Sequence, residues 1–231
     1  MSVNTNSHRL VIFGVSNILS DLFDCALANH ISVSKIVIDL PEEMGPRNIS
    51  LTDRLLQLES ICDQPTVEDL ENFEPSLGEL YLLGPTTPTR VVLANKLKDR
   101  FDLSFHTLIH PTAYISPLAS LAEGVFVGAN SVIGPGVRLD EHVFVNRGVT
   151  IGHDTYIGSF SRIQPGSNLG GLSHIGRGVT VGLGANLLER LIVGDGAIIG
   201  AGAVVISDVP ANELFVGIPA KFKKTLLNYA S

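Results

Sequence analysis

An aliphatic residue returns at every sixth position of this 231-residue chain, from Ile109 to Val205. The 17 positions of this series hold only Ile, Val or Leu, and the frame does not slip once. A period of six fits neither an α-helix nor a simple two-faced strand. It is typical of a solenoid whose flat sides are short strands. The sequence therefore predicts a prism with these aliphatic side chains pointing inward.

Small residues accompany the hexads. Most aliphatics follow a small or β-branched residue by two positions, and glycine often comes directly after them. We expect this glycine to relieve a turn whose backbone torsions other residues avoid. Three hexads would complete one triangular coil, so residues 18 apart would stack on one face and 17 hexads would give between five and six coils. Each coil would bury its aliphatics only against its neighbours. The recurring glycines are Gly128, Gly134, Gly152, Gly158, Gly170, Gly176, Gly182, Gly194 and Gly200.

The first hundred residues carry a different pattern. Apolar runs at 9–14, 35–39 and 79–84 predict buried strands, and apolar spacing over 17–30 and 89–100 predicts helices. Repeated β-α-β order is typical of a small parallel sheet with helices outside. The stretch 41–78 is broken by prolines and gives no clear pattern apart from a helix favoured over 50–61.

These patterns predict two domains. A small Rossmann-like α/β domain would span residues 1–108, and an all-β parallel solenoid with a C-terminal tail would span 109–231. The boundary falls near His110-Pro111, since proline cannot donate a ladder hydrogen bond.

Composition excludes several classes of protein. The net charge of −7 argues against nucleic acid as the main partner. No stretch reaches 18 uninterrupted apolar residues, so we expect no membrane insertion. Cys25 and Cys62 are too few for a disulfide framework, and the polar N-terminus lacks the apolar part of a signal peptide. The chain is therefore predicted to be cytoplasmic.

His153 is the candidate for chemistry, because it follows the inward Ile151 by two positions and should face outward. Imidazole accepts a proton near neutral pH, and the adjacent Asp154 could orient the ring. Gly170 and Gly171 lie about one coil later, where glycine would expose backbone N–H groups to a ligand. A base beside a glycine shelf favours acyl transfer. A solvated surface histidine, or a solenoid that serves only as a spacer, is the alternative.

A zinc site of the carbonic anhydrase type is a further alternative, and it needs three histidines. His142, His153 and His174 stand at different phases of the hexad, so we expect no metal site.

The hexads of the form Ile-Gly-x-x-x-x, followed by Phe-Val-Gly-Ile-Pro-Ala-Lys at 215–221, resemble the left-handed β-helix acyltransferases. With the α/β domain in front, the chain is similar to bacterial sugar acetyltransferases typified by the PglD and NeuD proteins. The similarity runs from Arg9 to Lys224 and is most specific over 146–166. It implies a left-handed coil, acetyl-CoA as co-substrate, and a homotrimer with the cofactor between neighbouring solenoids.

The resemblance also implies roles for single residues. His153 would be the general base in a direct transfer without an acyl-enzyme, and Asn146 matches a polar active-site position. Gly171, preceded by Gly170, matches the glycine whose N–H faces the acetyl carbonyl or pantetheine. Four further positions match the cofactor groove: Leu183 and Ala201 along pantetheine, and Pro219 and Lys221 near the nucleotide end.

Two departures from the family pattern concern the site. Many members have a carboxylate directly before the histidine, where this chain has Gly152, and Asp154 could replace it. Arg162 stands where many members have a second histidine near the acetyl group. Arginine stays charged and cannot carry a proton, so it could instead bind a carboxylate, a phosphate or the acetyl oxygen.

The nucleotide-binding loop of the family is also changed. Of its glycines only Gly14 is present, with Ser16 beside it and Ile18 where the family often has histidine. Asp39 remains at the end of the second strand, where it could meet a base or ribose. Gly14, Ser16 and Asp39 are therefore the candidate substrate contacts, and a structural remnant is the alternative for this half.

The reading that these observations favour is an acetyl-CoA-dependent N-acetyltransferase acting on the amino group of a nucleotide-linked amino sugar. O-acetylation of a sugar of the sialic acid type is one alternative. A non-catalytic trimeric binding or structural protein is another.

Overall fold

The computed structural model describes residues 8–42 and 45–226, which divide into two compact units. The first unit runs to Thr86 and includes Leu93–His106, and the second comprises Thr87–Val92 and the chain from Thr107. The change of unit after His106 falls two residues before the predicted boundary. Thr87–Val92, predicted as part of the first domain, belongs with the second unit. No helix of the described residues is long and apolar enough to cross a membrane.

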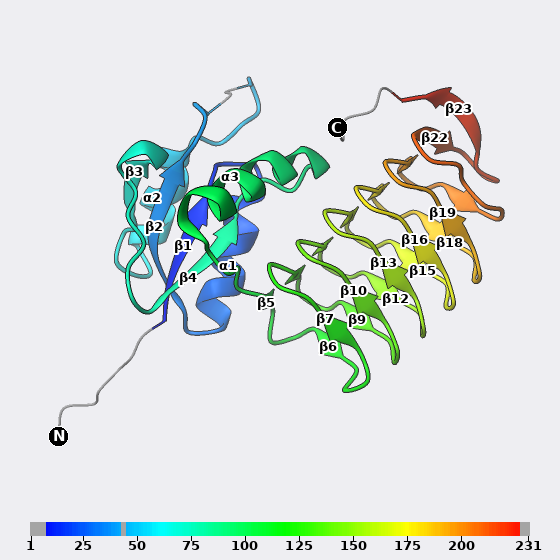
Figure 1. The fold of residues 1–231 in the computed structure, drawn as a ribbon, viewed down its shortest axis with the longest axis horizontal. Coiled ribbons are helices and arrows are strands. Elements are labelled where there is room, and N and C mark those ends of the chain that lie inside the picture. The colour runs from blue at the N-terminus through cyan, green and yellow to red at the C-terminus, as the bar shows by residue number, and fades with distance from the viewer. Residues whose placement is uncertain (1–7, 43–44, 227–231) are drawn as a thin grey trace. The chain divides into compact units, whose positions relative to one another are not determined.

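The first unit contains a parallel sheet in the order β3-β2-β1-β4 (Figure 1). Every pairing in it is parallel. Its core is aromatic, because Phe73 lies edge-on to Phe13 at 5.0 Å and to Phe101 at 5.3 Å between ring centroids. The elements of this part of the chain are β1 (Arg9–Phe13), α1 (Leu19–Ala28), β2 (Ser32–Ile38), α2 (Leu51–Glu59), β3 (Thr66–Asp69), η1 (Leu70–Asn72), β4 (Glu79–Leu83), η2 (Pro88–Arg90) and α3 (Val91–Phe101).

The second unit is a parallel β-helix. Its 17 strands from β5 to β21 are two residues long, and each ends on one of the predicted aliphatic positions. They are β5 (Leu108–Ile109), β6 (Tyr114–Ile115), β7 (Ser120–Leu121), β8 (Phe126–Val127), β9 (Val132–Ile133), β10 (Arg138–Leu139), β11 (Phe144–Val145), β12 (Thr150–Ile151), β13 (Tyr156–Ile157), β14 (Arg162–Ile163), β15 (Asn168–Leu169), β16 (His174–Ile175), β17 (Thr180–Val181), β18 (Asn186–Leu187), β19 (Ile192–Val193), β20 (Ile198–Ile199) and β21 (Val204–Val205). A hairpin of β22 (Glu213–Val216) and β23 (Lys221–Thr225) follows.

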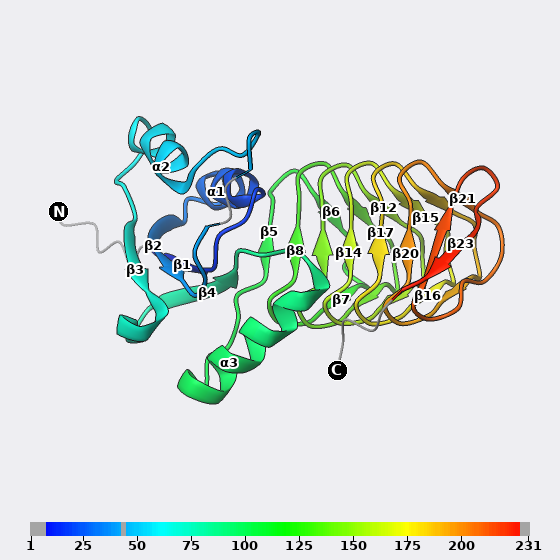
Figure 2. The same ribbon diagram turned by 90° about the horizontal axis from the view of Figure 1, so that it is seen from above.

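Strands three apart pair with each other, so that Ile151 stands opposite Ile133 and Leu169, each 18 residues away. Figure 2 shows the successive coils side by side. Three sheets result, named here after their first strands as the β5, β6 and β7 sheets. The prediction of three hexads per coil is thus confirmed, and the left-handed sense stays an expectation of the resemblance.

The interior of the solenoid combines aliphatics with buried hydroxyls. From Val127 onward the inward aliphatics are almost fully buried. The hydroxyl of Ser131 donates to the carbonyl of Asn146 at 2.8 Å and accepts from the N–H of Val149 at 3.2 Å. The small residue before the aliphatic thus ties one coil to the next, which meets the hydrogen-bonding need of a buried polar group.

The glycines after the aliphatics have a different role from the one predicted. They do not have positive φ, so the expectation of unusual torsions is wrong. A Cβ on Gly152 would lie 2.5 Å from the nitrogen of Gly171, and one on Gly170 would lie 2.4 Å from the nitrogen of Glu189. Glycine is needed there because consecutive coils approach so closely. Positive φ occurs two residues further on, as at Asp154 (55°) and Gly184 (65°).

Candidate active site

His153 lies at the corner between the β6 and β7 sheets, directly after β12. Its side chain is 54% exposed, and its Nδ1 lies 2.9 Å from Oδ2 of Asp154. Asp154 takes the left-handed backbone conformation, which Asp tolerates better than most residues. Because the carboxylate engages Nδ1, the Nε2 atom is the nitrogen left to exchange a proton with a ligand. The pair has the geometry of an oriented base.

Gly171 lies beside the imidazole. A Cβ added to it would lie 2.8 Å from Nε2 of His153, so the absent side chain makes room for the ring. Gly171 is buried and its carbonyl accepts from the N–H of Arg190, while the N–H of Gly170 donates to Leu187. The base therefore lies over the side of the predicted shelf that a side chain at position 171 would occupy. In the described part of the chain, the N–H of Gly171 has no hydrogen-bond acceptor.

Two of the predicted cofactor positions form a separate column: Leu183 and Ala201 lie 18 residues apart at the corner between the β5 and β6 sheets, and both are exposed. Pro219 is exposed in the turn between β22 and β23, next to Ala220, whose N–H donates to the carbonyl of Val204. Lys221 is exposed at the start of β23. The β6 sheet separates this column from His153, so one protomer does not bring the base and these residues together.

Asn146 and Arg162 lie on the β5 side. Asn146 directly follows β11, where the chain turns from the β5 sheet towards the β6 sheet. It is buried, and its Oδ1 accepts from the N–H of Arg147 at 2.8 Å. Arg162 projects outward from β14, and its Nε donates to Oγ1 of Thr180 at 3.0 Å. Burial lowers the pKa of Arg162.

The other two histidines of the solenoid lie elsewhere. His142 is buried at a corner between the β7 and β5 sheets and stacks on Phe160. His174 is exposed on the β7 sheet and stacks on Tyr156, whose hydroxyl donates to Asp140 at 2.5 Å. Among residues 8–42 and 45–226, no three His, Cys, Asp or Glu side chains are grouped as a metal would require.

In the first unit, the loop after β1 packs against the loop after β4. Gly14 is buried with φ of 79°, and a Cβ there would lie 2.9 Å from the ring of Pro85. The hydroxyl of Ser16 donates to the carbonyl of Gly84 at 2.8 Å. Pro85 thus occupies the space that a side chain at position 14 would need.

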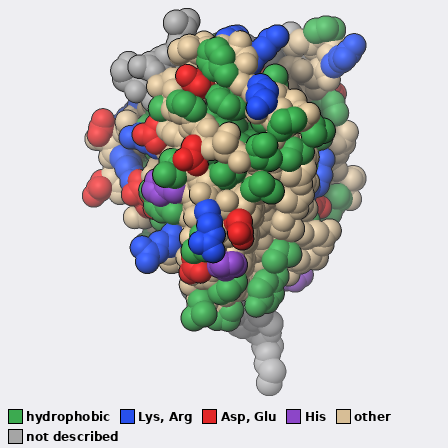
Figure 3. All heavy atoms as spheres, turned by 90° about the vertical axis from the view of Figure 1, so that its right-hand side faces the viewer, with side chains coloured by type: hydrophobic (Ala, Val, Ile, Leu, Met, Phe, Trp, Pro, Cys, Tyr) green, Lys and Arg blue, Asp and Glu red, His purple; other side chains and the backbone are tan. Residues whose placement is uncertain are grey.

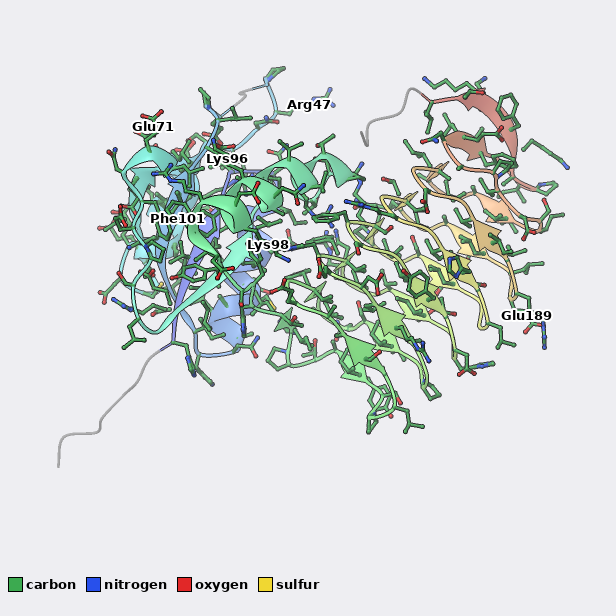
Figure 4. The ribbon with its side chains drawn as sticks, viewed as in Figure 1. Arg47, Glu71, Lys96, Lys98, Phe101 and Glu189 are labelled. Carbon is green, nitrogen blue, oxygen red and sulfur yellow. The ribbon has the colours of Figure 1, made fainter. Side chains whose placement is uncertain are left out.

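Asp39 instead lines a pocket of about 470 Å³ at the carboxyl ends of β2 and β3. Its carboxylate is ion-paired with Nζ of Lys96 at 2.5 Å. The walls include apolar Ile38, Leu40, Pro41 and Leu70, and charged Asp39, Asp69, Glu71, Lys96 and Arg100. Figure 4 labels Glu71 and Lys96 on the neighbouring η1 and α3.

Sequence reasoning did not identify Lys96 and Arg100. Their spacing of four residues puts them on one face of the predicted helix over 89–100, and this spacing was the one feature of the sequence that could have indicated a shared site. That this face meets the end of β2 depends on packing between residues 57 apart in the chain.

Comparison with solved structures identifies the class of fold. The acetyltransferase domain of PglB from Neisseria gonorrhoeae, in complex with acetyl coenzyme A, is 25% identical with a TM-score of 0.78, covering 94% of this chain and 100% of that one. A mutant perosamine N-acetyltransferase from Caulobacter crescentus, with CoA and GDP-perosamine, is 25% identical with a TM-score of 0.78, covering 93% and 96%. WeeI from Acinetobacter baumannii shares the fold at 20% identity, with a TM-score of 0.71 and coverage of 93% and 99%.

No family model matches the chain, and no curated protein sequence does so. Fold and solved structures together define the class: the chain has the structure of the acetyl-CoA-dependent β-helix acetyltransferases. The narrower resemblance to PglD and NeuD proteins stays a prediction.

Proposed function

We propose that the protein transfers the acetyl group of acetyl-CoA to the amino group of a nucleotide-linked amino sugar, with His153 as general base. The observation that carries the proposal is the His153–Asp154 pair, with the Nε2 of a half-exposed ring beside Gly171. The likeness over nearly the whole chain to an acetyltransferase domain and to a perosamine N-acetyltransferase supports it.

The reaction follows from this geometry. Asp154 accepts a hydrogen bond from the Nδ1–H and so fixes the tautomer in which Nε2 has a free lone pair. Nε2 takes a proton from the amine as its nitrogen attacks the thioester carbonyl. The new C–N bond forms, the C–S bond breaks, and the thiolate of CoA recovers the proton from the imidazolium. The unused N–H of Gly171 is the candidate donor to the developing oxyanion, an interaction worth about 3 kcal/mol.

The complete site requires a second copy of the chain. His153 and the column of Leu183 and Ala201 lie on opposite sides of the β6 sheet, so a neighbour must bring its column to His153. A homotrimer does this three times by rotation. The column would then hold pantetheine, and Lys221 would face a phosphate of CoA.

Exposed apolar side chains support such an assembly. Leu118, Leu172 and Leu188 lie on or beside the corner that carries His153, with relative exposures of 75%, 42% and 53%. Figure 3 shows hydrophobic side chains in green on the face that the end of the solenoid presents. Exposed apolar groups along one corner are typical of a surface that another chain covers.

The pocket beside Asp39 is the proposed place for the nucleotide. Its volume lies within the range of small-molecule sites, and ligands of parallel α/β sheets bind at the carboxyl ends of the strands. Apolar walls suit a base, and Asp39 suits ribose hydroxyls once Lys96 turns to solvent. Gly14 and Ser16 would contribute by holding the adjacent loop, and their direct contact with substrate stays a prediction.

The test is release of free thiol from acetyl-CoA with a panel of nucleotide-linked amino sugars. His153→Ala should lower turnover by about 100-fold or more, the usual contribution of a general base. His174→Ala is the matched control, because it removes another exposed histidine of the solenoid and should keep the rate. A His153→Ala variant with a near-normal rate, or a wild-type protein that is monomeric by light scattering, would overturn the proposal.

A further inference from the structure

Arg162 has an unusual position on the outward face of the β5 sheet. It stands between Phe144 and Thr180 in the register of the coils. Phe144 is buried and stacks on Phe126 at 4.7 Å, so the position paired with Arg162 on the preceding coil is apolar. Arg162 itself is partly shielded but still reached by solvent.

Arg162 has no counter-charge. Within the described residues no carboxylate lies within 4.0 Å of it, whereas Lys35 and Lys96 are both ion-paired. Among residues 8–42 and 45–226, its one hydrogen bond runs from Nε to Thr180. Nη1 and Nη2 have no acceptor among these residues. A cation held away from water without a partner is costly, which is why most such groups are paired or neutralised.

A second guanidinium increases the positive charge. Arg90 is 4% exposed, and it donates to the backbone carbonyls of Thr87, Ser161 and His142. Ser161 immediately precedes Arg162. The pKa of Arg90 is lowered to about 9, first by burial and then by the charge of Arg162. Two cations thus share a region of the second unit with low access to water.

We propose that Arg162 and Thr180 form an oxyanion-binding subsite on the β5 sheet, which takes a carboxylate or phosphate group of a substrate. With Nε held by Thr180, the guanidinium presents its Nη1 and Nη2 edge as a two-pronged donor, a geometry that matches the paired oxygens of either group. Arg90 raises the local positive potential.

The choice of ligands rests on the proposed function, because an acyl-CoA enzyme offers two sources of such an anion. One is a free carboxylate at the far end of the acyl group, as in a dicarboxylic acyl-CoA. The other is a phosphate of CoA or of the acceptor nucleotide.

Calorimetric titration of the whole protein at fixed ionic strength distinguishes these sources. The ligands are acetyl-CoA, succinyl-CoA, acetyl-CoA without its 3′-phosphate, and UDP. Arg162→Gln should bind the ligands that carry the recognised carboxylate or phosphate about 10-fold to 100-fold more weakly, as expected when a charge-assisted hydrogen bond is lost. Arg162→Lys should be intermediate, since it keeps the charge and loses the fork. Arg138→Gln removes an exposed arginine of the β7 sheet and should bind like wild type.

The pattern of losses identifies the source. A wild-type preference for succinyl-CoA that disappears in Arg162→Gln indicates a carboxylate. A weakening towards acetyl-CoA that is absent for the dephosphorylated form indicates the 3′-phosphate, and one confined to UDP indicates a nucleotide phosphate. The proposal is overturned if Arg162→Gln, folded as judged by its melting curve, binds all four ligands like wild type, or if the wild type binds none. Because the readout is binding, it is independent of turnover through His153.

Discussion

The two units of this protein are held together in different ways. The first unit surrounds an aromatic cluster, where Phe13, Phe73 and Tyr81 fill volume between helices and sheet. Over residues 107–226 the solenoid has no such cluster inside it, and its aliphatics stack between coils whose backbones nearly touch. The difference shows that the first unit depends on side-chain volume and the solenoid on backbone spacing.

The strongest test of this difference replaces two glycines of one coil. A Cβ on Gly182 would lie 2.6 Å from the nitrogen of Ala201, whereas Gly184, with φ of 65°, has open space around it. Gly182→Ala should lower the free energy of unfolding by about 3 kcal/mol, because coil spacing must change. Gly184→Ala should cost about 1 kcal/mol, the strain of a left-handed alanine. Denaturant titration measures both, and equal losses would show that spacing is not the controlling factor.

A smaller effect is expected from removing a single hydroxyl in each unit. Ser131→Ala leaves the carbonyl of Asn146 and the N–H of Val149 without their buried partner, which should cost about 2 kcal/mol. Ser60 in the first unit is exposed and donates only to the carbonyl of Gln57, so Ser60→Ala should change stability by less than about 0.5 kcal/mol. A Ser131→Ala variant as stable as Ser60→Ala would mean that water replaces the lost hydroxyl.

The least disruptive test uses the cysteines, which occur only in the first unit. Burial raises the pKa of Cys25 to about 12, so its reactive thiolate is scarce at pH 8, while Cys62 is more accessible. A thiol reagent should modify Cys62 in the native protein and Cys25 only after the first unit opens. Reaction of both thiols at one rate would show that the first unit opens readily. The solenoid does not contribute to this signal, because it contains no cysteine.

The sequence predicted the solenoid almost residue by residue, because a fixed period of six determines both strand position and pairing. The reason for its glycines was missed, since close approach of two backbones cannot be read from one coil. In the first unit, β3 was not predicted because Thr66–Asp69 is a polar stretch on the edge of the sheet without an apolar run. The strand predicted from 35 begins at Ser32, where alternating serines hide its start.

The candidate site was predictable to a similar degree. The outward corner of His153 follows from its offset to Ile151. The contact with Asp154 depends on a backbone torsion of Asp154, and the contact between Asp39 and Lys96 joins two distant segments. The separation of His153 from Leu183, Ala201 and Pro219 becomes clear only when it is known which sheets each strand and turn belong to.

The 18-residue coil also limits how such a protein can change length. Parallel strands lie about 4.8 Å apart, so each extra coil would extend the column of Leu183 and Ala201 by that step. Addition of one full coil after Val205 would leave the corner of His153 untouched and lengthen the groove for a longer cofactor arm. Addition of a single residue within a strand of the repeat would instead turn its aliphatic outward, so the interior of the repeat is kept only when a whole coil is added.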